Sequence, residues 1–115
     1  MTSDGEEKIL RFIGLAARAG QAVSGSGACE ETLKNGKAHL LIVAKDISRN
    51  SMDKILDWAS AGNRKTGKAI NCFSFSTAES LGYAIGKSNR AAIVITDEGF
   101  ARKLEEMLEG YKEDI

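Results

Sequence analysis

A short turn rich in glycine and serine is the first feature of the sequence that could bind a ligand. Residues 24–27 are Ser-Gly-Ser-Gly, and they precede a weak helical pattern that ends near Asn35 and Gly36. Amide groups at a helix N-terminus carry partial positive charge, and glycines let an anion approach them closely. The turn therefore predicts an anion-binding site, with a purely structural strand-to-helix turn as the alternative.

Two common nucleotide-binding motifs do not fit this turn. A dinucleotide-binding motif needs a third glycine three residues after Gly27, where the sequence has Glu30. A P-loop is excluded because no Gly-Lys-Ser or Gly-Lys-Thr follows at the turn. The expected anion site is thus of neither type.

A second polar segment, residues 86–90, joins a predicted helix to a predicted strand. Lys87 and Arg90 place two cations beside the small polar side chains of Ser88 and Asn89. Such a loop can hold a nucleic-acid backbone, because most protein contacts to nucleic acids are made to phosphate and sugar. The alternative is an ordinary solvated connection after a helix end.

Candidate catalytic groups are sparse. Asp46 and Asp97 each follow a predicted strand, where ligands and metals often collect in α/β sheets. Turn formation and helix capping explain both aspartates, with a magnesium site as the minor alternative. His39 has no serine or cysteine nucleophile in a known motif beside it. We therefore expect no enzyme activity, no cofactor and no metal.

The cysteines predict neither a zinc site nor a disulfide. Cys29 and Cys72 lie far apart without a Cys-x-x-Cys pair. The N-terminus is acidic where a signal peptide is basic and then apolar, and no apolar run approaches the roughly 20 residues that span a bilayer. We expect a cytoplasmic protein with no membrane role, whose two thiols are reduced and lie in the core.

The hydrophobic pattern alternates between helical and extended segments. Capping residues, helical periodicity and glycine stops predict the helices, whereas short apolar or β-branched runs predict the strands. Five helices are expected. The first begins after Ser3 and ends at Gly20, and the second covers 24–36. The third runs from Asn50 or Ser51 to Gly62 or Gly67, and the last two cover 76–86 and 96–110. The expected strands cover 40–44, 70–75 and 91–96, with a short extended segment at 21–24.

The third expected helix has an apolar stripe at helical spacing. The stripe consists of Met52, Ile55, Leu56 and Ala59, and Trp58 lies outside it. We expect the stripe to face the core.

Alternation of strands and helices through all 115 residues predicts a mixed sheet between helical layers. The expected fold class is α/β, a three-layer α-β-α sandwich with a mixed sheet of about four strands. One domain would cover residues 1–115, with its core at about 8–108, and a second domain has no room.

Four segments of the chain are similar, in order and spacing, to those of a known family. They are residues 13–20, 40–46, 81–87 and 95–101. The chain resembles the YlxQ-type bacterial branch of the kink-turn RNA-binding family, which includes the ribosomal proteins called L-seven-Ae and L-thirty-e. The similarity spans about residues 8–108. It implies an α-β-α sandwich that binds bent RNA.

The resemblance also implies where RNA would be contacted. The family's contact surface corresponds to residues 25–31 and 87–92. Members with strong kink-turn recognition carry Asn-Glu and a following lysine where this sequence has Gly27, Ala28 and Glu31. The residues expected to bind RNA are Gly25, Ser26, Gly27, Ala28, Glu31, Lys34, Lys87, Ser88, Asn89 and Arg90, with Lys34 replacing the lost cation.

Overall charge gives no general attraction to nucleic acid. The formal net charge is +0 and the pI is about 6.6, so RNA binding must depend on a local patch. The expected partners are structured RNA, with ribosomal RNA as one candidate, and a ribosomal or other protein. We expect a monomer. The alternative function is a protein-interaction module that has kept the fold and lost kink-turn recognition, which Glu31 and the neutral charge favour.

Overall fold

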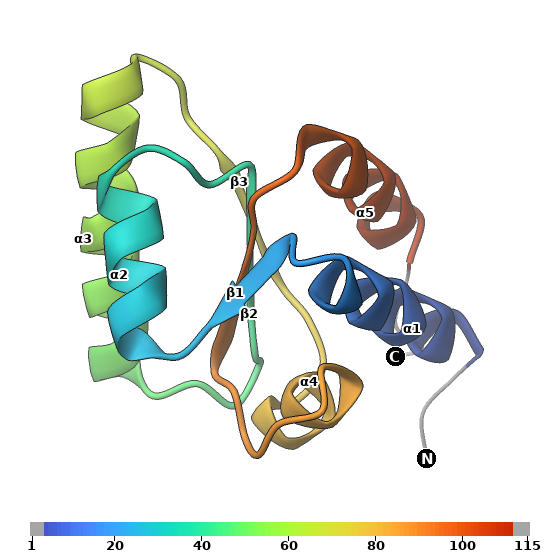
Figure 1. Ribbon diagram of the computed structural model, residues 1–115. Coiled ribbons are helices and arrows are strands. Elements are labelled where there is room, and N and C mark those ends of the chain that lie inside the picture. Colours follow the sequence, from blue (N-terminus) through green and yellow to red (C-terminus); the bar gives the residue numbers. More distant parts are fainter. Residues whose placement is uncertain (1–3, 112–115) are drawn as a thin grey trace.

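The computed structural model describes residues 4–111 and contains, within them, five helices and four strands. Their order along the chain is α1 (Asp4–Arg18), β1 (Ala22–Ser24), α2 (Ser26–Lys34), β2 (Leu40–Val43), α3 (Arg49–Thr66), β3 (Asn71–Ser74), α4 (Ala78–Ala84), β4 (Ala92–Ile95) and α5 (Glu98–Gly110). Figure 1 shows the sheet between two helical layers, with α2 and α3 on one side and α1, α4 and α5 on the other. The predicted α-β-α sandwich is confirmed.

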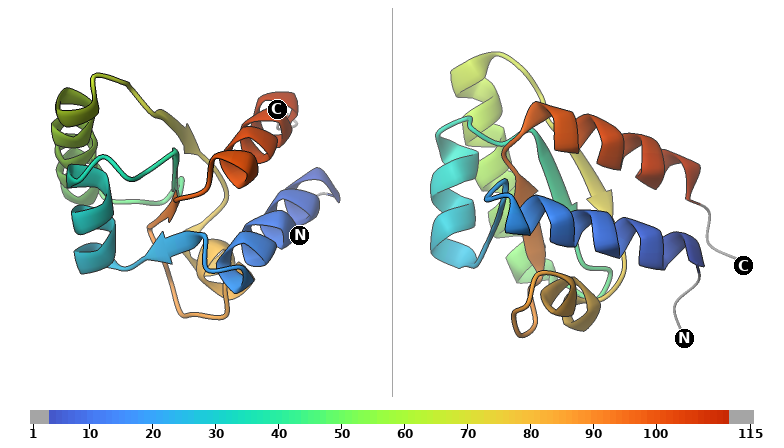
Figure 2. Two further views of the ribbon diagram at one scale, coloured as in Figure 1. Left: turned by 45° about the horizontal axis from the view of Figure 1, so that its top comes forward. Right: turned by 45° about the vertical axis from the view of Figure 1, so that its right-hand side comes forward.

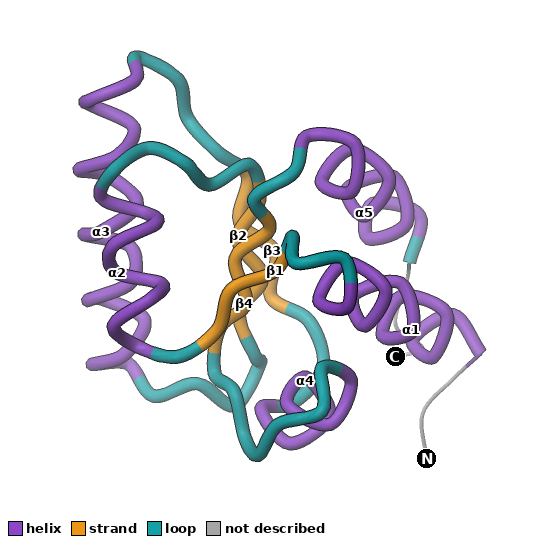
Figure 3. Tube along the Cα trace, in the orientation of Figure 1, coloured by secondary structure: helices purple, strands orange, loops and turns teal. Residues whose placement is uncertain are grey.

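The sheet is mixed and has the strand order β1-β4-β2-β3. β2 and β3 are parallel, whereas β4 is antiparallel to both of its neighbours, β1 and β2. Figure 3 shows the four strands crossing the middle of the molecule. β1 and β3 are therefore the two edges.

The central strands are buried on both faces, which explains their unbroken apolar sequences. Successive side chains of a strand point to opposite faces, so each strand contributes to two cores. Leu40, Ile42, Ile93 and Ile95 pack with α1, α4 and α5. Leu41, Val43 and Val94 pack with α2 and α3, the pair that lies apart from α1 and α5 in both views of Figure 2.

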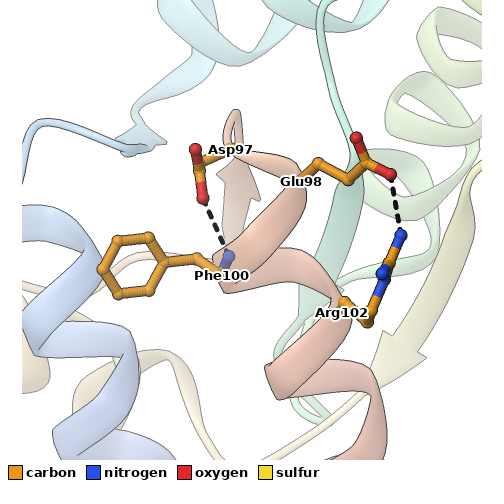
Figure 4. A network of polar contacts seen from close by, with 4 residues as sticks. All are labelled: Asp97, Glu98, Phe100 and Arg102. Atoms are coloured by element: carbon orange, nitrogen blue, oxygen red, sulfur yellow. Dashed lines mark hydrogen bonds and ion pairs between the residues drawn. The ribbon is translucent and has the colours of Figure 1, made fainter.

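The last helix begins where the sequence predicts it. Asp97 is the N-cap of α5, and its Oδ2 accepts a hydrogen bond from the Phe100 amide at 2.9 Å (Figure 4). Glu98 lies in the first turn and accepts a hydrogen bond of 2.9 Å from Arg102, which lies one helical turn later. A capping aspartate and a favourable helical ion pair stabilise this end of α5.

The third helix differs from the prediction at its start and on its buried face. Its N-cap is Ser48, whose Oγ accepts from the Ser51 amide at 3.2 Å, so the expected caps Asn50 and Ser51 are wrong. Leu56 is exposed, whereas Trp58 is partly buried and packs on the core. The reason is that α3 also packs against α2, which turns the buried stripe away from Leu56.

Gly62 marks the contact between these two helices. It is buried inside α3, and a Cβ atom there would overlap the carbonyl oxygen of Leu33 in α2. The helix continues to Gly67, which ends it with a positive φ of 76°. Of the two expected stops, Gly67 is the C-cap and Gly62 is a packing residue.

Two further expectations need correction. The helix expected over residues 76–86 begins later, because Thr77 caps α4 by accepting from the Ser80 amide at 3.1 Å. Ser76 instead is buried and donates to Glu6 in α1 at 2.9 Å. Cys29 is buried as expected, but Cys72 is exposed because β3 is an edge strand whose side chains are largely uncovered. The expected start of the first helix at Ser3 lies outside the described residues.

The described residues contain no helix with the length and apolarity needed to cross a bilayer.

Candidate nucleic-acid interface

Sheet register brings the glycine turn next to the loop that precedes β4. β1 pairs antiparallel with β4, and Ser24 lies opposite Ile93. The chain leaves β1 at Ser24 and enters β4 at Ala92, so the two flanking segments lie side by side at the same end of the sheet (Figure 1). The two segments that the sequence singled out are therefore neighbours in space.

The turn itself depends on a glycine. Gly25 has φ 90° and ψ 145°, a conformation that L side chains rarely adopt. Its carbonyl oxygen accepts the first helical hydrogen bond, from the Cys29 amide at 2.9 Å. The amides of Ser26, Gly27 and Ala28 precede that bond, and the first N–H groups of a helix have no partner within it.

The N-terminus of α2 differs from those of α3, α4 and α5. Those three helices are capped by the side chains of Ser48, Thr77 and Asp97, whereas no side chain caps α2. Its first turn also contains no acidic residue. Uncapped amides and an unneutralised helix dipole together favour an anion at this point.

The loop from residue 85 to residue 91 is fastened over α4. The Lys87 amide donates to Gly82 at 2.8 Å, and the Arg90 amide donates to Ala78 at 2.9 Å. Gly82 is buried, and a Cβ atom there would overlap the carbonyl oxygen of Ser88. The loop can lie this close to α4 only because residue 82 has no side chain.

Arg90 extends from this loop towards the glycine turn. Its Nε donates to Ser24 Oγ at 3.2 Å, and its Nη1 donates to the Asn89 carbonyl at 3.0 Å and to Ser88 Oγ at 3.3 Å. Among residues 4–111 it forms no ion pair with a carboxylate. A fixed guanidinium with its charge uncompensated thus lies beside the N-terminus of α2.

A hollow of about 350 Å³ lies between these parts and α3. Gly25 and Ser26 line it from the turn, and Asn89 and Arg90 line it from the loop. The remaining lining comes from Ser51, Lys54, Ile55 and Trp58 of α3, together with Cys29, Ala91 and Ala92. The surface is mixed, with cations and hydroxyl groups around an apolar floor.

Sequence reasoning missed the contribution of α3 to this surface. Lys54 and Trp58 lie one helical turn apart, and both line the hollow. The available clue was the position of Trp58 outside the predicted apolar stripe, since a large aromatic away from the core pattern is a candidate contact residue. Nothing local indicated that α3 would lie beside the glycine turn.

Cys29 closes the floor of the hollow as a neutral thiol. It is 2% exposed, and its Sγ donates to the Val23 carbonyl at 3.8 Å. Burial raises the pKa of the Cys29 thiol to about 11, and the charge of Arg90 opposes that shift. Because the thiolate is the nucleophilic form, this cysteine serves as a packing group.

The two aspartates that follow strands have structural partners. Asp46 Oδ1 accepts from the Ala78 amide at 2.9 Å at the start of α4, and Asp97 caps α5. Within residues 4–111 no group of three or more His, Cys, Asp or Glu side chains is placed to hold a metal ion.

Six of the ten expected RNA-binding residues do not line the hollow. Glu31 is exposed on α2, and Lys34 forms an ion pair with Glu30 one turn earlier. Lys87 lines a separate groove between α1 and α4. Gly27 and Ala28 are exposed beside the hollow, and Ser88 contributes by accepting from Arg90. The roles of all these residues in RNA binding remain predictions.

Known proteins are similar to this chain in sequence and in fold. Residues 7–105 match the model of the ribosomal protein L7Ae/L30e/S12e/Gadd45 family. RNA-binding protein YlxQ of Enterococcus faecium is 33% identical over 110 residues, covering 96% of this chain and 100% of that protein. RNA-binding protein YlxQ of Bacillus subtilis strain 168 is 32% identical over 102 residues, covering 85% of this chain and 92% of its own.

Two solved structures superpose on the chain. A Bacillus halodurans protein of unknown function has a TM-score of 0.76 and 32% identity, and the match covers 89% of this chain and 97% of that one. The 15.5 kD RNA-binding protein of Giardia lamblia has a TM-score of 0.69 and covers 95% of this chain and 91% of its own. At 18% identity the second match shows a shared fold alone.

Fold and site together define a small α/β sandwich with an uncapped helix N-terminus and a neighbouring arginine at one end of its sheet. The family match covers most of the chain, and the two YlxQ proteins align with it over most of their length. The chain belongs to the ribosomal protein L7Ae/L30e/S12e/Gadd45 family, as its sequence motifs indicated.

Proposed function

We propose that this protein binds structured, bent RNA at the surface formed by the N-terminus of α2, the loop before β4 and the first half of α3. The observation that carries the proposal is the uncapped N-terminus of α2 beside the fixed guanidinium of Arg90. The names of the two YlxQ relatives, which are RNA-binding proteins, support it. Binding requires neither a cofactor nor a chemical step.

In this proposal a phosphate lies between the free amides of residues 26–28 and Arg90. Amide groups and a guanidinium are the usual partners of phosphate oxygens, and both are in place before binding. The hollow between them admits an unstacked base, which Trp58 contacts from α3. A straight duplex keeps its bases stacked, so this arrangement favours RNA that is bent or interrupted.

Ribosomal RNA is the first candidate ligand, because the family includes ribosomal proteins. We further propose that the protein acts as a monomer in the cytoplasm. Only a few cations face the site, so the binding free energy would come from a few well-placed phosphates rather than from a broad basic surface.

The experiment that tests the proposal is a titration of the protein with a kink-turn RNA and with a straight duplex of equal length, each at low and high salt. We expect tighter binding of the bent RNA, with a preference that persists at high salt because shape recognition is not screened. Equal binding of both RNAs that disappears with added salt would contradict the proposal.

A protein-interaction module is the second candidate function. It is favoured by the carboxylate of Glu31 on α2, near the proposed phosphate site, and by the zero net charge of the chain. Failure to bind either RNA at low salt would favour this alternative, since electrostatic attraction to phosphate is strongest under that condition.

A further inference from the structure

A groove between α1 and α4 lies outside the surface described so far. It consists of two adjoining hollows of about 600 and 670 Å³, which share Gly14, Arg18, Tyr83 and Ala84. The helices approach closely because residue 14 has no side chain, since a Cβ atom there would lie 2.7 Å from the Ala84 carbonyl oxygen. Figure 1 shows α4 beside α1, next to the loop that carries residues 86–90.

Tyr83 is the most prominent side chain of this groove. It is 84% exposed, far more than Leu15 at 46% and Leu56 at 42%. The short helix α4 buries Leu81 and Gly82 but leaves Tyr83 in solvent, so the fold makes no use of its ring. An exposed aromatic face is a suitable platform for stacking a nucleobase.

The charges of the groove are unevenly placed. Arg18 lines both hollows, and Lys87 lines the one nearer the loop. Within residues 4–111 neither of these cations forms an ion pair or a side-chain hydrogen bond. Glu7 and Glu79 line only the other hollow, which also contains Arg11. Two unpaired cations, Arg18 and Lys87, thus lie with Tyr83 in the part of the groove that adjoins the loop.

We propose that a single-stranded extension of the bound RNA runs from the loop into this groove, with one base stacked on Tyr83 and phosphates beside Arg18 and Lys87. The inference rests on the proposed function, because Lys87 belongs both to the RNA-binding loop and to the groove. Nucleic acid fits the exposed ring and its two unpaired cations better than a protein segment, which would need an apolar or acidic face to match them.

The test compares the bent RNA alone with the same RNA carrying a short single-stranded extension, placed at either end in turn. We expect one of the two extensions to tighten binding by roughly tenfold, which is in the range measured for one base stacked on an aromatic ring. Tyr83→Ala should remove this gain and leave the affinity for the unextended RNA unchanged. Tyr83→Phe should retain the gain, because stacking does not need the hydroxyl group.

Arg18→Gln provides a second probe, with Arg64→Gln at the far end of α3 as its matched control. The first substitution should reduce the gain from the extension, and the second should not. Circular dichroism would show that all four variants fold, which the exposure of the three substituted positions leads us to expect.

The possible outcomes separate this inference from the proposed function. If unextended and extended RNAs bind equally well, the inference is overturned while RNA binding stands, and the groove becomes a candidate surface for a protein partner. A gain that persists in Tyr83→Ala also overturns it, because the extension then lies elsewhere. If neither RNA binds, both proposals fail.

Discussion

Arg90 Nε donates a hydrogen bond to Ser24 Oγ over 3.2 Å, although the two residues lie 66 positions apart in the chain. Ser24 ends β1, and Arg90 lies near the end of the loop that precedes β4. The bond therefore joins the two segments that frame the candidate site and holds the guanidinium beside the free amides of α2. A cation positioned in advance loses little side-chain entropy when a phosphate arrives.

Removing the charge of Arg90 should weaken RNA binding. We expect Arg90→Gln to lower affinity by roughly tenfold or more, because a charge-assisted hydrogen bond to phosphate is lost. The slope of log K against log salt should also become shallower by about 1, since one fewer phosphate is neutralised. Titrations at several salt concentrations measure both effects. Ser24→Ala is the control, because it removes the hydrogen bond that holds the guanidinium but keeps the charge of Arg90. In this variant affinity should fall less than in Arg90→Gln, and the salt slope should stay unchanged.

Reversing the charge of Glu31 should have the opposite effect. Glu31 is exposed on α2 at the position where strongly binding relatives are expected to carry lysine. Glu31→Lys should raise RNA affinity and steepen the salt slope by about 1, because a repulsive charge becomes an attractive one. Glu109→Lys on α5 makes the same change in net charge away from the site and should leave affinity almost unchanged. Equal gains in both variants would show that only overall charge matters.

A methyl group at position 82 should disturb both stability and binding. Because a Cβ atom at Gly82 would overlap the Ser88 carbonyl oxygen, the loop must move away from α4 to accept it. We expect Gly82→Ala to lower the free energy of unfolding by about 1–3 kcal/mol, as overpacking does, and to weaken RNA binding through the displaced loop. Urea denaturation and RNA titration test the two effects. Gly110→Ala has open space around it and should keep both properties.

The thiol of Cys29 should make stability depend on pH in the alkaline range. Burial raises its pKa from 9.0 to about 11, so the folded state favours the protonated thiol. The contribution of this thiol to the free energy of unfolding is complete below about pH 9 and is lost as the pH rises towards 11. The reason is that in this pH range Cys29 ionises readily only in the unfolded chain. The loss amounts to about 2 kcal/mol. Urea denaturation at pH 8 and pH 10.5 should show a larger fall for the wild-type chain than for Cys29→Ala, and equal falls would exclude this role of the thiol.

Local patterns in the sequence identified the elements and the fold class. The unbroken apolar run of residues 40–43 indicated a strand buried on both faces, and β2 is such a strand. Asp97 and Gly67 were recognisable as helix ends because capping involves atoms only a few residues apart. The glycine turn and the loop around Arg90 were found in the same way, from residue types alone.

Features that depend on packing between distant segments could not be found from one sequence. The burial of Trp58, the exposure of Leu56 and the position of Lys54 beside the glycine turn all follow from how α3 packs against α2 and the sheet. Helical periodicity narrows the buried face to a stripe, but the neighbouring elements decide which edge of that stripe is covered.

By itself the sequence determined the order of strands and helices, the α/β class and the two polar segments, because hydrogen bonding and side-chain periodicity within an element are local. Only the tertiary structure decided that β1 and β4 pair, which places Ser24 beside Arg90, and that Tyr83 remains in solvent. These are contacts between residues far apart in the chain, and their free energy comes from burying the faces of whole elements together.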